Sequence, residues 1–179
     1  MSFIRTYTGI KFAPAEARPE DIEIVDIAHA LSLLCRANGH FRDFFSVAQH
    51  SLNCAKEAAA RNYSARIELA CLLHDASEAY ISDITRPVKE LLPRYLELER
   101  ELQKTIYAKY LRRELEPEEG KLVREIDDLM LYHEFKDLMN ERVFEQEPSR
   151  RSTPDYRFSS FIQTEKEYLE RFYCLIKRM

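Results

Sequence analysis

The 179-residue chain has no tryptophan and only three glycines. Because tight hairpin turns and bulges draw on glycine, this scarcity argues against a loop-rich β architecture. No uninterrupted apolar run approaches the roughly 20 residues of a membrane-spanning helix. The opening stretch MSFIRTYTGIKF also lacks the apolar core of a signal or transit peptide. The sequence therefore predicts a cytoplasmic protein with no membrane partner.

The chain also has no excess of positive charge, with 27 lysines and arginines against 31 aspartates and glutamates and a net charge of −4. This balance argues against a general surface for a nucleic-acid polymer. A small anionic ligand stays compatible with it, since a local cluster of cations needs no positive total. The four cysteines lie in helical apolar patterns rather than in a loop framework, which favours a reducing compartment and again the cytoplasm.

Helical periodicity is the main pattern that is present. Ser46 and Gln49 have the spacing of a capping box, and Ser64 and Pro117 are suited to helix starts. We expect helices over residues 26 to about 37, 47 to about 61, 65–80, 94–111, 118–139 and 158–176. This pattern predicts an all-α fold, a bundle of about six helices.

The length and composition suit one domain over residues 1–179. Within it we expect a short extended N-terminal arm over 1–25, where TYTGIKF favours a hairpin or an extended strand. The functional core is expected over 26–139, and a C-terminal loop and helix over 140–179.

The stretch HDASEAY places a histidine and two acids at the end of an otherwise apolar segment. Burying such charges costs several kcal/mol unless a partner or a metal compensates. His50 lies eleven residues before the short turn at 61–64, and His74 lies ten residues after it. At a rise of 1.5 Å per residue both are about 15 to 16 Å from the turn, so antiparallel helices bring the two imidazoles level. With Asp75 they form three potential metal ligands, a set that suits Zn, Mn, Fe or Co.

A fourth ligand is expected from another helix, where REIDD offers Asp127 or Asp128. Asp128 has Arg124 four residues earlier and is placed to form a surface ion pair. Asp127 has Val123 and Leu131 at the equivalent spacings and faces the apolar side, so the helix pattern favours Asp127.

A rival arrangement uses the cysteines. Cys54 follows His50 by one turn and Cys71 precedes His74 by about one turn, so these four side chains are candidates for a closed structural zinc site. This interpretation leaves Asp75, Glu78 and Asp127 without a role. Buried free thiols on helices are also common without a metal.

Together, His50 in SVAQHS, His74 and Asp75 in LLHDASEAY, and Asp127 in VREID resemble the HD superfamily of metal-dependent phosphohydrolases. The segment YISDITRPVK that follows is similar to the bacterial 5'-deoxynucleotidase branch of that superfamily. The resemblance implies a helical HD fold and one divalent ion, such as Mn, Co, Zn, Fe or Mg, held by these four residues.

The resemblance also implies roles in catalysis and substrate binding. Glu78 falls on the catalytic glutamate, Asp83 on an aspartate that helps hold the nucleotide, and Arg36 on an arginine that binds phosphate, with Arg42 as the competing position. The deoxynucleotidases have a tryptophan where this chain has Ala37. From its charge and position, Lys89 is a further candidate for a phosphate contact.

The leading hypothesis is a phosphohydrolase that releases phosphate from a nucleoside 5'-monophosphate, its small-molecule partner. The alternatives are a deoxynucleoside triphosphate triphosphohydrolase, then a cyclic-nucleotide phosphodiesterase, and, outside enzymes, a helical binding module with a structural metal. Relatives commonly dimerise, so a homodimer is expected.

Overall fold

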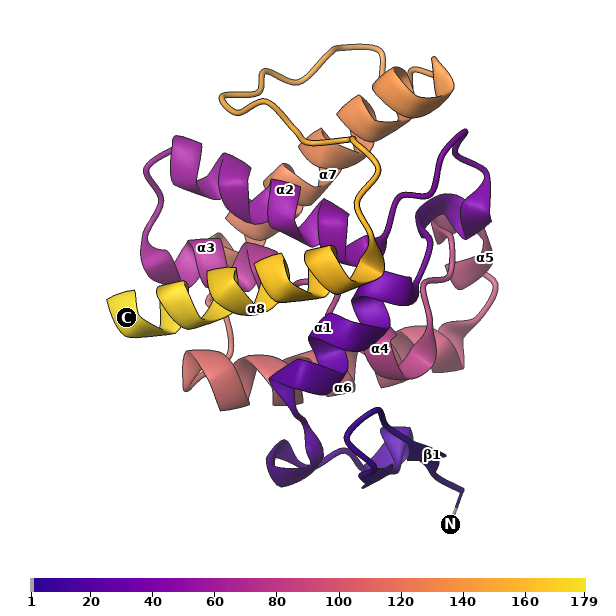
Figure 1. Cartoon of the computed structure of the whole chain (residues 1–179), viewed down its shortest axis with the longest axis vertical. Coiled ribbons are helices and arrows are strands. Elements are labelled where there is room, and N and C mark those ends of the chain that lie inside the picture. The colour runs from indigo at the N-terminus through magenta and orange to yellow at the C-terminus, as the bar shows by residue number, and fades with distance from the viewer. Residues whose placement is uncertain (1) are drawn as a thin grey trace.

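The computed structural model describes residues 2–179, which fold into a helical bundle with a small N-terminal hairpin (Figure 1). The long helices are α1 (Ile24–Leu33), α2 (Val47–Ala60), α3 (Ala65–Leu73), α6 (Pro93–Leu111), α7 (Pro117–Met139) and α8 (Phe161–Arg178). Two four-residue helices, α4 (Glu78–Ile81) and α5 (Arg86–Lys89), lie between α3 and α6, and the hairpin pairs β1 (Ile4–Arg5) with β2 (Lys11–Phe12). The predicted all-α fold, with six long helices and an extended arm, is confirmed.

The centre of the bundle is the pair α2 and α3. Both helices contact α7 and α8, and α8 crosses in front of them in Figure 1. In the last turns of α3, the side chains of residues 69–73 are completely buried. A helix that is apolar on every side belongs in the interior, which explains why this segment is surrounded by other helices.

Side-chain caps fix where the central helices begin. Ser46 and Gln49 form the predicted capping box at the start of α2, and the Ser64 hydroxyl accepts a hydrogen bond from the amide of Ile67 at the start of α3. Such caps satisfy amides that lack a partner within the helix, and each contributes about 1 kcal/mol.

Two predicted helices are shorter than expected. The segment expected to be helical over 65–80 stops at Leu73, and a new helix begins only at Glu78. Gln103 of α6 stabilises the interruption, because its amide donates to the Leu73 carbonyl at 2.7 Å and its oxygen accepts from the Ser77 amide at 3.1 Å. Likewise α1 ends at Leu33, and residues 36–39 form a separate 3-10 turn.

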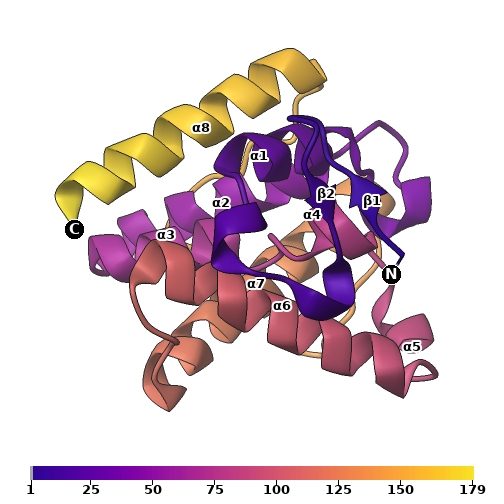
Figure 2. The same cartoon turned by 90° about the horizontal axis from the view of Figure 1, so that it is seen from below.

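The N-terminal arm and the loop before α8 contact the bundle at different places. The N-terminal arm lies beside α1 and α4 (Figure 2), where Asp26 of α1 accepts hydrogen bonds from the backbone amide and hydroxyl of Thr8. The loop before α8 lies on α2, where buried Glu57 accepts hydrogen bonds from the amides of Arg151 and Ser152.

The division of the domain at residues 25 and 139 stays a prediction. Within residues 2–179 no helix is both long and apolar enough to cross a membrane.

Candidate metal centre

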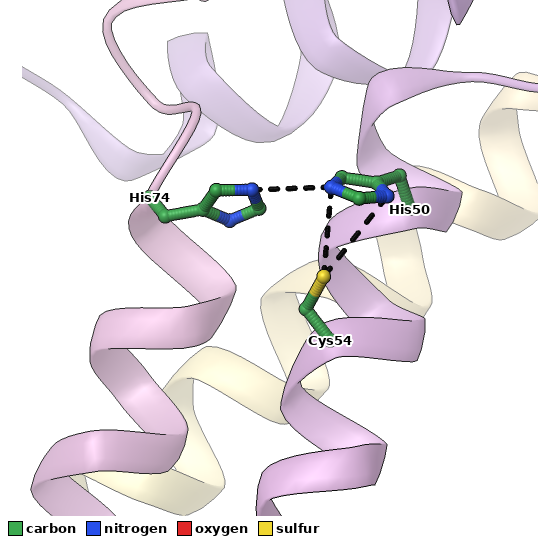
Figure 3. Close-up of side chains that lie close together, drawn as sticks. All are labelled: His50, Cys54 and His74. Carbon is green, nitrogen blue, oxygen red and sulfur yellow. Dashed lines mark hydrogen bonds between the residues drawn. The ribbon is translucent and has the colours of Figure 1, made fainter. Parts of the chain in front are cut away.

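The structure brings four predicted ligands together from three parts of the chain. His50 comes from α2, His74 and Asp75 from the turn after α3, and Asp127 from α7. The Nε2 atoms of the two histidines are 3.1 Å apart, and Figure 3 shows the two ring nitrogens pointing toward each other. The Asp127 Oδ1 atom lies 3.2 Å from His50 Nε2, and the Asp75 Oδ2 atom lies 3.2 Å from His74 Nε2. Two further distances between histidine and aspartate atoms, His50 Nε2 to Asp75 Oδ2 and His74 Nε2 to Asp127 Oδ1, are 3.7 and 3.6 Å.

In each histidine ring, the hydrogen-bond partner of Nδ1 determines which nitrogen carries the proton and which has a free lone pair. His74 Nδ1 lies 2.8 Å from the Cys71 carbonyl, which only accepts hydrogen bonds, so Nδ1 must carry the proton. His50 Nδ1 lies 2.5 Å from a carboxylate oxygen of Glu134 and donates to it in the same way. In the neutral rings both Nε2 atoms therefore present lone pairs to the cluster.

A divalent cation fits this donor set. With both rings neutral, two imidazole nitrogens and two carboxylate oxygens lie close together, and all four are acceptors. Ligands at about 2.1 Å from a cation are about 3.0 Å apart in octahedral and about 3.4 Å apart in tetrahedral geometry. Three of the observed separations, at 3.1 to 3.2 Å, lie between these edges, and the other two, at 3.6 and 3.7 Å, exceed the tetrahedral edge by about 0.2 to 0.3 Å.

The charges of the cluster also favour a cation at this point. Burial acts to lower the pKa of His74, but Asp75 and Asp127 raise it well above its ordinary value. Burial acts to raise the pKa of Asp127, but the two histidines lower it well below its ordinary value. Positive charge is thus stabilised between these carboxylates, as proton or as metal.

One cysteine of the rival zinc site lies at the cluster. Cys54 Sγ is 3.5 Å from His50 Nε2, one turn further along α2 (Figure 3). Among the described residues, this group of His50, Cys54 and His74 does not extend to Cys71, the fourth ligand of a closed zinc site. Burial raises the pKa of both thiols, which disfavours the thiolate form that binds metal.

A cavity of about 300 Å³ opens beside the cluster. Its lining contains every residue predicted to act on the substrate, together with both predicted aspartate ligands: Arg36, Asp75, Glu78, Asp83, Lys89 and Asp127. Another part of the wall is apolar and is formed by Ile84, Pro87, Leu131, Phe135 and Val143. The cavity therefore offers cations, acids and an apolar surface to a single ligand.

Glu78 is almost completely buried at the start of α4, with 3% of its surface exposed. Its Oε1 atom accepts a hydrogen bond from Lys89 Nζ at 3.1 Å, and its Oε2 atom has no partner among the described residues. Burial, with the negative charges of Asp75 and Asp83, raises the pKa of Glu78 well above its ordinary value. A carboxyl group in this state can exchange a proton near neutrality.

Arg36, not Arg42, lies at the cavity. Arg36 is buried and contacts Asp75 at 3.4 Å, whereas Arg42 is exposed and does not line the cavity. Since α1 ends at Leu33, Arg36 lies in the 3-10 turn that follows and not at the end of a helix running to about residue 37, as expected. Burial acts to lower the pKa of Arg36, but Glu134 and Asp75 raise it, so the guanidinium stays charged.

Two residues at the site were not anticipated from the sequence. Glu134 lies behind His50, and its spacing of seven residues from Asp127 was an available signal, because such residues share one helix face. Arg86 contacts Asp127 at 3.0 Å and Asp128 at 2.7 Å. Asp128 thus forms its ion pair with Arg86 instead of the Arg124 expected from helical spacing.

Fold and site together define a class: helical proteins with a partly buried cluster of histidines and aspartates beside a cavity lined by cations and acids, an arrangement suited to metal-assisted chemistry. Comparison with known families gives the particular family. The HD domain matches residues 46–160, and the chain belongs to the HD domain family. Membership implies a metal-dependent phosphohydrolase with a divalent ion.

Two bacterial proteins are similar over much of their length. The uncharacterized protein YfdR of Escherichia coli is 39% identical over 138 residues, which are 77% of this chain and 73% of YfdR. An uncharacterized protein of Rhodobacter capsulatus is 37% identical over 111 residues, which are 59% of this chain. The match spans only 57% of the Rhodobacter protein, less than two thirds of its length.

Proposed function

We propose that the protein is a nucleotide phosphohydrolase of the 5'-deoxynucleotidase-like HD branch, and that it releases phosphate from (deoxy)nucleoside 5'-monophosphates. The observation that carries this proposal is the shared cavity, in which a buried acid and two cations adjoin the four-residue cluster. Its volume of about 300 Å³ lies at the small end of the range for ligand pockets, which supports a mononucleotide.

In this proposal His50, His74, Asp75 and Asp127 hold one divalent ion. An ion bound there supplies a water of lowered pKa and neutralises charge on the phosphate. Mn, Co, Zn, Fe and Mg are all candidates, because mixed nitrogen and oxygen donors do not select among them.

The remaining polar residues orient the substrate and move a proton. Arg36 binds the phosphate through its planar guanidinium, whose charge is secured by the neighbouring carboxylates. Lys89 holds the Oε1 atom of Glu78 and adds positive charge to the cavity. Glu78 donates a proton to the 5'-oxygen as it leaves, and Asp83 accepts a hydrogen bond from a sugar hydroxyl.

The apolar wall of the cavity is suited to contact a nucleobase, at the end of the ligand away from its phosphate. Phe135 and Leu131 of α7 and Val143 face the cavity together with the cationic residues. Ala37, which also lines the cavity, has no bulky side chain to sense the sugar 2' position. The proposal therefore includes ribose and deoxyribose substrates.

A second candidate is a deoxynucleoside triphosphate triphosphohydrolase. Arg86 favours it, since this third cation lines the same cavity and suits a ligand with more phosphates. A helical binding module with a structural metal is the alternative without catalysis. We further propose that the protein acts in the cytoplasm, where its four free thiols stay reduced, and as a homodimer.

A substrate screen with a matched pair of variants tests the proposal. Nucleoside mono-, di- and triphosphates are incubated with each divalent ion, and released phosphate and triphosphate are identified. Glu78→Gln should reduce turnover by about 10²- to 10⁴-fold with unchanged metal content. Glu99→Gln is the control, because Glu99 contacts the same Lys89 amine without lining the cavity, and it should retain most activity.

The outcomes separate the three candidates. Release of triphosphate would favour the second candidate. Full turnover by Glu78→Gln would remove Glu78 from catalysis. A metal-loaded protein that hydrolyses no nucleotide would favour the binding module.

A further inference from the structure

Glu134 of α7 joins two parts of the site that have different tasks. Its side chain has no exposed surface, so both oxygens depend on protein partners. Oε1 lies 2.5 Å from His50 Nδ1, and Oε2 accepts a hydrogen bond from Arg36 Nε at 3.1 Å. One carboxylate therefore contacts both a predicted metal ligand and the predicted phosphate-binding group.

Each contact fixes an orientation. By accepting a hydrogen bond from His50 Nδ1, Glu134 directs the Nε2 lone pair toward His74 and Asp127, as outer carboxylates do in histidine metal sites. By binding Nε of Arg36, it leaves the terminal guanidinium nitrogens for other partners, and Nη1 points to Asp75 at the cavity.

We propose that Glu134 is a positioning residue that holds the His50 ring and the Arg36 guanidinium as one unit, so that metal affinity and phosphate affinity both depend on this carboxylate. The inference rests on the proposed function, because it takes His50 as a metal ligand and Arg36 as the phosphate contact. It adds a dependence between them that neither assignment requires.

The competing explanation is a buried ion pair that serves stability alone. The chain offers a matched example in Glu57, whose side chain is equally buried and contacts Arg61 and the amides of Arg151 and Ser152. Glu57 does not line the cavity and has no contact with the metal cluster. Glu57→Gln therefore measures the cost of removing a buried carboxylate charge outside the site.

The experiment compares Glu134→Gln with Glu57→Gln in the full-length protein. Glutamine has one acceptor oxygen, and its NH₂ group would face a donor, so one of the two Glu134 contacts must be lost. The dissociation constant of Mn²⁺ would be measured from the spin-resonance signal of free Mn²⁺. The dissociation constant of inorganic phosphate would be measured by calorimetry on the Mn²⁺-loaded protein. Glu134→Gln should weaken at least one of them by 10- to 100-fold, while Glu57→Gln should keep both within twofold.

A double-variant cycle identifies the route of the effect. Once Arg36 is replaced by glutamine, Glu134→Gln should have no further effect on phosphate affinity. Any effect on Mn²⁺ affinity should persist in that background, because it passes through His50. If the phosphate effect also persists in full, Glu134 does not act through Arg36 and the proposal is overturned.

Other results are equally decisive. If Glu134→Gln lowers the unfolding temperature as Glu57→Gln does but keeps both affinities within twofold, Glu134 is only structural. Should Glu134→Gln fail to fold, Glu134→Asp keeps the charge and withdraws it by about 1.5 Å, one C–C bond. It should then weaken Mn²⁺ or phosphate binding at least tenfold, and unchanged affinities overturn the proposal.

The positioning role and the proposed function fail in different ways. A wild-type protein that binds Mn²⁺ and phosphate, loses one of them in Glu134→Gln, and hydrolyses no nucleotide would retain the positioning role and lose the catalytic one. Turnover of nucleotides with no loss of affinity in Glu134→Gln would do the reverse.

Discussion

Replacing Asp127 by asparagine tests the metal assignment, with Asp128→Asn as a matched control. The two carboxylates are neighbours on α7 and contact the same Arg86 guanidinium, at 3.0 and 2.7 Å. Only Asp127 also faces the histidines, with Oδ1 at 3.2 Å from His50 Nε2. The pair therefore separates a loss at the metal cluster from a loss of the ion pair with Arg86.

The expected signal is a shift in the unfolding temperature on adding metal. A ligand that binds only the folded state at 100 times its dissociation constant stabilises it by about 2.7 kcal/mol. Unfolding entropy is about 2.1 cal/mol/K per residue, which for 179 residues gives about 0.38 kcal/mol/K. Dividing the two predicts a rise of about 7 °C in the wild type.

Asparagine at 127 removes one negative charge and one ligand oxygen. Loss of an outer partner of a metal ligand already costs 10- to 100-fold in affinity, so we take about 100-fold for this direct ligand. The same metal concentration then equals the dissociation constant, and the stabilisation falls to about 0.4 kcal/mol, or about 1 °C. Asp128→Asn should retain a rise of about 7 °C.

Scanning calorimetry on chelator-treated protein, with and without Mn²⁺ or Co²⁺, provides the measurement. Each variant is compared with its own metal-free form, so any stability change from the substitution itself cancels. A full shift in Asp127→Asn with a lost shift in Asp128→Asn would show that the wrong aspartate was assigned.

Two further predictions concern the thiols and the pH dependence of stability. The double variant Cys54→Ser, Cys71→Ser should retain one metal per chain by elemental analysis, since the four-residue cluster needs no thiol; loss of the metal would support the zinc alternative. Burial acts to raise the pKa of Glu119, but hydrogen bonds from Arg113 and Arg66 lower it from 4.5 to about 2. Its contribution to stability is therefore complete above pH 4.5 and is lost as the pH falls through about 2. Denaturant titration should show Glu119→Gln less stable than wild type by about 1 kcal/mol at pH 7, with the difference vanishing near pH 2; an equal difference at both pH values would contradict this reasoning.

Local signals were sufficient for the parts of the fold that depend on neighbouring residues. The capping box at Ser46 and the cap at Ser64 fix the starts of α2 and α3, and the short turn between them forces the helices to be antiparallel. Counting residues from that turn placed His50 and His74 level, and their Nε2 atoms are 3.1 Å apart. Helix rise and a short connection are geometric constants, which is why this step needed no tertiary information.

The partners of charged residues were harder to predict, because tertiary packing decides them. Helical spacing offered Arg124 to Asp128, but the connector that contains α5 brings Arg86 to the same carboxylate. Glu134 shares a helix face with Asp127, yet its contact with Arg36 spans 98 positions of the chain. No local pattern carries a contact of that range.

The interruption after Leu73 could not be predicted from its own sequence, although the site depends on it. Residues 74–80 contain alanines and a glutamate that favour helix, and the contacts that stabilise the break come from Gln103, on another helix. In a continuous helix, neighbouring side chains point about 100° apart and do not face a common point. His74 and Asp75 are neighbours, yet His74 Nε2 and Asp75 Oδ2 lie 3.2 Å apart.

After Leu73 the chain continues in tighter turns, in which the Ala76 amide donates to the Leu73 carbonyl, and it is from this turn that two consecutive residues approach one site. A helix end leaves backbone carbonyls without their usual helical partners. Here the Cys71 carbonyl accepts from His74 Nδ1, and the Leu73 carbonyl accepts from the backbone amide of Ala76 and the side-chain amide of Gln103. The first of these bonds also fixes the proton on Nδ1, so Nε2 is free for the cluster. The chain then restarts as α4 with Glu78 at its first position, inside the cavity. The short segment between α3 and α4 thus carries a histidine, an aspartate and, at its end, a buried glutamate to the same site.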